Sequence, residues 1–397
     1  MNDSYIRLSY EERLLLSICR LEFSDQQKSE IRELLKEIRD WDHFVKLANE
    51  HGIIAMCWYN INQIGATSDI PRGSLEILHS AYLKSLMRNT FLYNHLAGVA
   101  SLANENNIKI VLLKGIALEK TVYGNKGFRQ MSDIDILVRK DEAASLRRIL
   151  LKNGFTTAPL VSRFHEKIMP AYGKHLPEMY KKGVAVEIHF RLFDDRENHL
   201  TEELFNTAGE LPGDESKVCY PEPQLHFLYL IKHLEKHEKS GFSQLRLYTD
   251  LLVLLSLYSS QIINDRLFEY AKMANLENAV ADKLILLNIY WGFAIPGHLK
   301  YSVEKFKTES VNAKFVEFLR HPGAGQDDGE SESLGKLIGD VPGFINKLLL
   351  TTGHIFPSVS YIKYRYKIKT TFGAVLYYPV RWRKQLGKLI SGRGYLF

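Results

Sequence analysis

The sequence predicts an α+β fold in which a strand-containing core lies between two helical regions. Apolar residues three and four positions apart cover residues 8–50 and 73–106, as in amphipathic helices. Between residues 107 and 200, short runs with strand character alternate with helical segments, and residues 201–320 return to the helical pattern. The length of 397 residues is typical of two or three structural units.

Three segments support the strand prediction. Residues 108–115 (IKIVLLKG) form a β-branched apolar run that ends in glycine, which indicates a buried strand entering a turn. Residues 133–139 (DIDILVR) alternate carboxylate and apolar side chains, as a strand with one polar face does. Residues 184–193 (VAVEIHFRLF) alternate in the same way, and a helix is predicted over residues 141–154 between these two strands.

Changes in composition divide the chain into five segments. The stretch HPGAGQDDGESES is rich in Gly, Asp, Glu and Ser and is typical of a flexible connector. The predicted segments are an N-terminal helical region (1–106), the α/β core (107–200), a helical domain (201–320), the connector (321–333) and a basic aromatic C-terminal extension (334–397).

The composition indicates a globular protein that is not secreted. Hydrophobic residues make up 45% and charged residues 25%, which is enough apolar material for a sizeable core. Three cysteines lie far apart without a CxxC pair, which favours reduced thiols in the cytosol. Acidic residues occur near the N-terminus where a signal peptide would be basic, and no apolar run reaches the length of a membrane span. We therefore expect a cytoplasmic protein.

The net charge of +6 comes from the C-terminal end. Residues 341–397 contain ten Lys and Arg and no acidic residue, so residues 1–340 carry a net charge of −4. Basic residues interleaved with Tyr and Trp suit an anionic membrane surface, which would place the protein peripherally at the inner membrane face. Nucleic acid is a less favoured partner, and a basic helical extension packed on the body of the protein is the third interpretation.

Asp133 and Asp135 are candidate metal ligands. Residues two apart in a strand point to the same face, so the two carboxylates project together and repel each other. A hard divalent cation with oxygen ligands, such as Mg²⁺, relieves that repulsion. The alternative is a solvated strand edge with two unrelated acids.

Glu187 strengthens the metal interpretation. It shares a strand face with Ala185 and His189, and a carboxylate in an otherwise apolar strand has few structural uses. Three carboxylates can hold two cations about 4 Å apart, as phosphoryl-transfer chemistry requires. The glycine turn at Gly115 would bring backbone N–H groups close to phosphate oxygens, and Lys114 would add a positive charge.

The segments LLKG (112–115), RQMSDIDILV (129–138) and VEIH (186–189), together with the helical stretches LHFLYLIKHLEKH and RLYTDLL, resemble an uncharacterised bacterial nucleotidyltransferase-like family of the polymerase-β-type superfamily. The resemblance covers roughly residues 85–255. It implies a small mixed β-sheet core with flanking helices. It also implies a nucleoside triphosphate substrate with two Mg²⁺ ions, or Mn²⁺ as the alternative. Asp133, Asp135 and Glu187 would then be the metal-binding and catalytic residues.

The nucleotide-binding residues that we predict are Lys114, Gly115, Arg129, Ser132, His189 and His233. The sequence departs from the superfamily where a serine usually follows the glycine, because Ile116 stands there. Arg129 would replace the missing phosphate contact through its guanidinium, or else form a surface salt bridge.

Several further side chains are weaker candidates. His226, His233 and His237 share one side of a predicted helix, where the alternative is an ordinary polar face. The resemblance places that helix against the catalytic sheet, which favours His233. Asp250 is expected to pair with Arg246, four residues earlier on a helix, in a structural role or in support of the site. His165 and His175 lie in an irregular stretch that could form a lid, and exposed histidines are the simpler interpretation.

The predicted function is magnesium-dependent transfer of a nucleoside monophosphate from a nucleoside triphosphate to an acceptor that the sequence does not identify. A non-catalytic nucleotide- or partner-binding module of the same fold is the first alternative, because Ile116 replaces the usual serine. A membrane-surface accessory protein in surface-glycan or natural-product biosynthesis is the second, because of the basic aromatic extension. No dinucleotide-binding, P-loop or zinc motif occurs in the chain.

Overall fold

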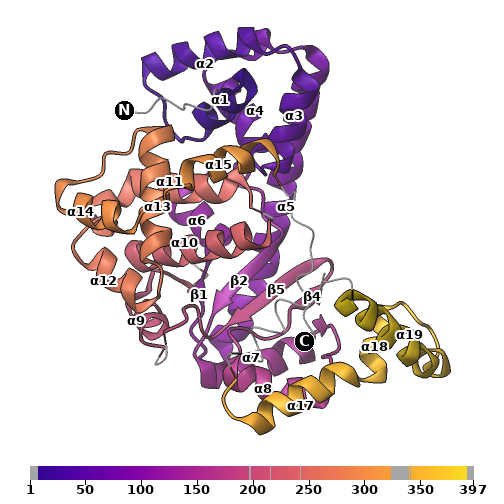
Figure 1. Cartoon of the computed structure of the whole chain (residues 1–397). Helices are drawn as coiled ribbons and strands as arrows, with labels where there is room; N and C mark the ends of the chain where they lie inside the picture. Colours follow the sequence, from indigo (N-terminus) through magenta and orange to yellow (C-terminus); the bar gives the residue numbers. More distant parts are fainter. Residues whose placement is uncertain are drawn as a thin grey trace. The chain divides into compact units, whose positions relative to one another are not determined.

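The computed structural model is an α+β protein with a seven-stranded mixed sheet and helical regions at both ends of the chain, which confirms the predicted fold class (Figure 1). It describes residues 8–195, 198–214, 216–241, 243–322, 339 and 341–390. These residues form two compact units. The first contains residues up to 101, 111–134 and 193–322, and the second contains residues 102–110, 135–192 and the C-terminal part from residue 339.

The N-terminal helices begin at well-formed caps. Ser9 and Ser24 each accept a hydrogen bond from the backbone N–H three residues later, and Glu12 and Gln27 bond back to the cap residues. Both are capping boxes, which satisfy the N–H groups that open a helix. The helices are α1 (Tyr10–Ile18), α2 (Asp25–Glu37), α3 (Trp41–Glu50), α4 (Ile54–Gln63), the 3₁₀ turn η1 (Thr67–Asp69) and α5 (Arg72–Glu105).

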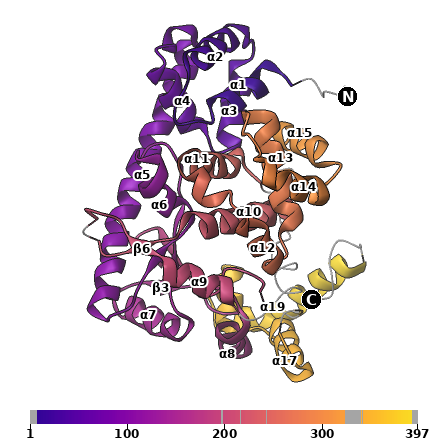
Figure 2. The same ribbon diagram turned by 90° about the vertical axis from the view of Figure 1, so that its left-hand side faces the viewer.

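The first unit also contains the helices that follow the α/β core in the sequence. Helix α10 (Pro223–Ser240) packs on α11 (Leu245–Ile262) and on α13 (Glu277–Trp291), which in turn packs on α14 (Gly297–Phe306) (Figure 2). The remaining elements of this helical part are α9 (His199–Thr207), α12 (Arg266–Met273) and α15 (Val311–Arg320). The three cysteines of the first unit, Cys19, Cys57 and Cys219, are buried thiols.

The sheet has the strand order β3-β4-β5-β2-β1-β7-β6. Strand β1 pairs with β7 in parallel, whereas the β7–β6, β3–β4 and β4–β5 pairs are antiparallel, so the sheet is mixed. The strands are β1 (Val111–Leu112), β2 (Asp133–Leu137), β3 (Thr156–Thr157), β4 (Met179–Lys181), β5 (Val184–His189), β6 (Gly209–Glu210) and β7 (Cys219–Tyr220).

The predicted strand over residues 108–115 is shorter in the structure. Strand β1 covers two residues, and the chain then enters the short helix α6 (Lys114–Leu118) and the π-helical turn η2 (Glu119–Tyr123). Lys114 has a φ of 51°, in the left-handed region that non-glycine residues rarely adopt. The backbone therefore turns at Lys114 rather than at Gly115.

The described part of the C-terminal extension forms helices that belong to the second unit. Helix α17 (Phe344–Ile355) lies beside α8 (Arg163–Tyr172), with Ile168, Val341 and Leu350 in a small apolar core between them (Figure 1). The other helices of this unit are α7 (Lys140–Lys152), α18 (Val359–Arg365) and α19 (Thr371–Ile390). The described part of the extension thus packs on other residues of the second unit.

Most of the predicted connector, residues 323–333, lies outside the described residues, as do residues 334–338, 340 and 391–397 of the extension. None of the helices in the described ranges combines the length and the apolar character needed to cross a membrane.

Replacing Gly353 with alanine is expected to loosen the packing of α17 on α8. An added Cβ would lie 2.1 Å from Oγ of Ser162 and 2.9 Å from its Cβ, and rotation of the Ser162 hydroxyl cannot relieve the contact with Cβ, so Ser162 or α17 must move. We expect a loss of about 1–3 kcal/mol in unfolding free energy, measured by urea denaturation, and faster proteolysis of the C-terminal helices.

Gly98→Ala is the matched control. Gly98 lies in α5 with open space around its Cβ position, so alanine should stabilise the helix by about 0.5–1 kcal/mol. Equal stability of Gly353→Ala and the unmodified protein would contradict the tight contact between α8 and α17.

Candidate metal and nucleotide site

Strands β2 and β5 bring together a buried group of possible metal ligands. Asp135 is buried in β2 between Ile134 and Ile136, both fully buried. In β5, Glu187 and His189 project from the face opposite to the apolar one, as the alternating pattern predicts. One ligand atom from each of Asp135, Glu187 and His189 lies within 4.8 Å of the other two.

The imidazole of His189 lies between the two carboxylates. Its Nε2 atom is 2.9 Å from Oδ1 of Asp135 and 3.1 Å from Oε2 of Glu187. An imidazole nitrogen carries at most one proton, so Nε2 makes at most one full-strength hydrogen bond to this pair of acids. One hydrogen bond does not offset the negative charge of two nearby carboxylates, and a cation bound beside them would do so.

His175 is a fourth member of the group that sequence reasoning did not select. Its Nδ1 atom is 2.9 Å from Oε1 of Glu187. The contact arises because residues 174–176 pair with β5, through a bridge between His175 and His189 and a hydrogen bond from the N–H of Leu176 to the carbonyl of Ile188. The sequence pattern of an irregular stretch contains no signal for this pairing.

The electrostatics of the group favour an ionised Glu187. Burial opposes its charge, but the hydrogen bonds and positive potential of His175 and His189 outweigh burial and hold the pKa of Glu187 well below its ordinary value. A carboxylate that is ionised, largely buried and directed at an imidazole can serve as a metal ligand at neutral pH.

The donor set fits a divalent cation. Adjacent ligands of an octahedral ion with bonds of about 2.1 Å lie about 3 Å apart, which matches the two distances from His189 Nε2. Two carboxylate oxygens suit Mg²⁺ and Mn²⁺, and an imidazole nitrogen suits transition metals. Asp135, Glu187 and His189 would hold the ion.

Asp133 occupies the first position of β2, two residues before Asp135. It belongs to the first unit, where its Oδ1 atom accepts a hydrogen bond of 3.0 Å from the hydroxyl of Ser132. The carbonyl of Ser132 accepts a hydrogen bond from Arg88 at 2.5 Å. The role of Asp133 as a metal ligand and that of Ser132 at the nucleotide stay predictions.

Arg129 and Asp250 form a buried ion pair in the first unit. Nε and Nη2 of Arg129 donate to the two carboxylate oxygens of Asp250, each at 2.7 Å, and the hydroxyl of Tyr123 donates to the same carboxylate at 2.8 Å. Burial opposes the charge of Arg129, but Asp250 outweighs it and raises the arginine pKa above its ordinary value. The alternative interpretation of Arg129, a surface salt bridge, is therefore wrong because the pair is buried, and its contact with phosphate stays a prediction.

The predicted pairing of Asp250 with Arg246 is also wrong. Arg246 donates to the carbonyl of Gln130 and to the side chain of Gln244. Burial and the positive charge of Arg129 lower the pKa of Arg246 to about 10. The spacing of four residues on a helix allowed the pair, but Arg129 reaches the same carboxylate from a distant part of the sequence.

Gly115 is needed for the packing of Arg129. An added Cβ at Gly115 would lie 2.0 Å from Nη1 of Arg129 and 2.8 Å from its Cζ atom. The sequence indicated a glycine for backbone approach to phosphate, and the structure gives a different reason for the same residue. Ile116 next to it is buried, as are the following residues of α6.

The three histidines of α10 have different environments. His226 is fully buried, its Nε2 atom has no hydrogen-bond partner in the described part of the chain, and burial lowers its pKa to about 4. The rings of His233 and His237 are in edge contact, with centroids 4.5 Å apart. Burial, together with the positive charges of Lys114 and His237, lowers the pKa of His233 well below its ordinary value. His226 is thus a core residue, and His233 is a neutral imidazole near Lys114.

His165 contradicts the simpler interpretation of an exposed histidine. It is buried in α8, its Nδ1 atom lies 3.0 Å from the hydroxyl of Ser162, and burial lowers its pKa to about 4. It belongs to the contact between α8 and α17.

Comparison with protein families decides the class of the protein. The model of the family described as uncharacterised nucleotidyltransferase matches residues 37–292, more than half of the chain. The chain belongs to this nucleotidyltransferase family. A search of curated proteins found no match.

The match confirms the predicted family resemblance and the assignment as a transferase. It contains every residue that we predicted for the nucleotidyltransferase site, from Lys114 to His233. The C-terminal helices from α17 onward lie outside it.

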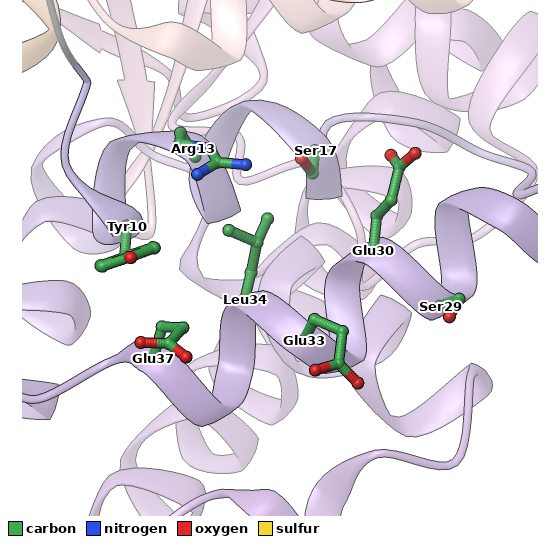
Figure 3. A pocket seen from close by; sticks show the side chains of 8 residues that line it. All are labelled: Tyr10, Arg13, Ser17, Ser29, Glu30, Glu33, Leu34 and Glu37. Atoms are coloured by element: carbon green, nitrogen blue, oxygen red, sulfur yellow. The ribbon is translucent and has the colours of Figure 1, made fainter.

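A hollow on the first unit is lined by residues that, apart from Glu37, precede the family match. It has a volume of about 430 Å³ and is bordered by side chains of α1 and α2, including Arg13, Glu30 and Glu33 (Figure 3). Figure 3 shows acidic side chains of α2 around this hollow, and none of the predicted site residues lines it. It therefore contributes nothing to the candidate nucleotidyltransferase site.

Asp250→Asn is expected to destabilise the nucleotidyltransferase by about 3–5 kcal/mol, because it leaves the buried Arg129 guanidinium without its counter-charge. Urea denaturation followed by circular dichroism measures the loss. Glu76→Gln is the control, since it removes the exposed pair with Arg72 and should cost about 0.5 kcal/mol or less. Similar losses in the two variants would show that the buried pair is not a structural element.

Proposed function

We propose that this nucleotidyltransferase transfers a nucleoside monophosphate from a nucleoside triphosphate to an acceptor, in a reaction that depends on Mg²⁺ or Mn²⁺. The observation that carries the proposal is the buried group of Asp135, Glu187 and His189, with ligand atoms within 4.8 Å of one another. Burying two carboxylates at this spacing costs several kcal/mol unless a cation or proton compensates them. The family match supports the reaction class.

Asp135 and Glu187 would hold a divalent ion, with His189 as a nitrogen ligand, and Asp133 would help to hold a second one. A bound ion would neutralise charge on the triphosphate, which accounts for much of the rate gain in phosphoryl-type transfer. The chain itself provides the position of the ligands, because β2 and β5 are held in a sheet with fully buried neighbours.

Glu187 is proposed to orient the acceptor rather than to deprotonate it. Its pKa lies well below the ordinary value, because His175 and His189 outweigh the effect of burial. A carboxylate with a depressed pKa is a weak base near neutral pH, but it remains a strong hydrogen-bond acceptor. An acceptor hydroxyl bonded to Glu187 would be held in line for attack.

Lys114 is the strongest proposed ligand for the leaving pyrophosphate. Arg129 is committed to Asp250 through two hydrogen bonds, so a phosphate contact by Arg129 would have to compete with that ion pair. Lys114 stands at a left-handed turn, a conformation that is frequent at functional sites. His233, which is neutral and within the field of Lys114, is proposed as a hydrogen-bonding contact to the nucleotide.

A non-catalytic binding module is the second candidate. Ile116 stands where the superfamily usually has a serine, and its buried side chain provides no hydroxyl for a phosphate. Isothermal titration calorimetry with each nucleoside triphosphate distinguishes the two candidates when it is combined with an assay for pyrophosphate release. Nucleotide binding without pyrophosphate release across a panel of hydroxyl and phosphate acceptors would favour the module.

Asp135→Asn is expected to lower metal-dependent pyrophosphate release by roughly a hundredfold or more, because it removes a charged ligand where negative charge must be neutralised. The affinity for Mn²⁺, measured by electron paramagnetic resonance, should fall in parallel. The free energy of unfolding should not decrease, because the substitution also removes carboxylate repulsion.

Asp141→Asn is the matched control, because Asp141 is an exposed acid of the same unit in α7. It should keep both metal affinity and turnover. Full activity of Asp135→Asn would rule out the proposed metal site.

A further inference from the structure

Helix α19 presents an apolar stripe to solvent. Phe372, Val375, Leu376 and Val380 are all exposed, by 75%, 51%, 59% and 44%. At 3.6 residues per turn they lie within an arc of about 140° on one side of the helix. Single exposed apolar residues are common on protein surfaces, but a contiguous apolar stripe is typical of an interaction site.

The opposite side of α19 is held by other residues of the second unit. Ala374 and Arg381, which lie about half a turn from the stripe, are buried. Arg381 donates hydrogen bonds to the hydroxyl of Tyr366 and the carbonyl of His354, and the indole of Trp382 donates to the carbonyl of Ile355 at 2.8 Å. These contacts fix which side of the helix faces outward.

Helix α17 repeats this arrangement. Phe344, Ile345 and Leu348 are exposed by 79%, 71% and 53%, whereas Leu350 and Gly353 on the other side are buried against α8. Two helices of the extension therefore each bury one side within the second unit and leave an apolar side exposed.

Cations border the stripe of α19. Lys369, Arg383 and Lys384 are exposed at its two ends, and residues 341–390 contain nine Lys and Arg and no acidic residue. Tyr377 and Trp382 are half-buried beside the stripe. An apolar stripe bordered by cations and by amphipathic aromatic rings matches the boundary between acyl chains and anionic headgroups.

We propose that the C-terminal helices, α19 foremost, bind the surface of an anionic lipid bilayer. Three of the four residues of the exposed stripe, Val375, Leu376 and Val380, are aliphatic and offer no ring on which a base could stack, which leaves Phe372 as the one ring of the stripe. Nucleic-acid surfaces combine cations with stacking aromatics, so the observed side chains favour lipid over nucleic acid. The proposal is independent of the proposed nucleotidyl transfer, because these helices lie outside the family match.

The test is co-sedimentation of the full-length protein with vesicles. Vesicles of phosphatidylcholine containing about one-third phosphatidylglycerol should bind the protein, vesicles of phosphatidylcholine alone should bind it much more weakly, and salt should weaken binding. Phe372→Ser/Leu376→Ser should reduce the affinity for the anionic vesicles by at least about tenfold. Lys369→Gln/Arg383→Gln/Lys384→Gln should do the same through loss of charge.

Tyr301→Ser is the matched control, because Tyr301 is 76% exposed in α14 and lies in the other unit. It should leave vesicle binding unchanged, and all variants should keep the urea midpoint of the unmodified protein. The proposal is overturned if anionic vesicles do not bind the protein, or if Phe372→Ser/Leu376→Ser binds them as well as Tyr301→Ser does. Salt-dependent binding of a single-stranded RNA without vesicle binding would assign the surface to nucleic acid instead.

Discussion

Two N–H groups of the buried Arg129 meet both oxygens of Asp250 at 2.7 Å, and the position of the segment before β2 depends on this ion pair. The guanidinium lies so close to Gly115 that no side chain fits there, so the same pair restricts the turn that carries Lys114. The carbonyl of Arg129 accepts a hydrogen bond from Asn89 of the long helix α5. The geometry of such a buried pair is strict, because water cannot solvate either charge if the two groups separate.

The second constraint is the cost of holding two acids next to each other in a sheet. Asp135 and Glu187 project from two strands whose Val, Ile and Leu side chains are buried, and neither strand can shift by one residue without exposing its apolar face. The carboxylates therefore stay together, and His175 and His189 reduce their repulsion. A site that keeps negative charge in place before substrate arrives is suited to bind a cation with little reorganisation.

The features that followed from the sequence are those with a regular period. Alternation in VAVEIHF placed Glu187 and His189 on one face, and alternation in DIDIL assigned Asp135 to a strand, because neighbouring residues along a strand determine these properties. The partners of Arg129 and Glu187 were not predictable in this way. Asp250 lies 121 residues from Arg129, and His175 comes from a stretch without strand periodicity.

The sequence by itself determined the fold class, the family and the pairing of Glu187 with His189 on one strand face, because local periodicity and short motifs carry that information. It also determined that the positive charge is concentrated in the C-terminal extension. Only the tertiary structure decided that Arg129 is buried against Asp250, that Gly115 makes room for it and that His175 completes the carboxylate group. These outcomes depend on which distant segments pack together, and packing is decided by the whole chain rather than by any one segment.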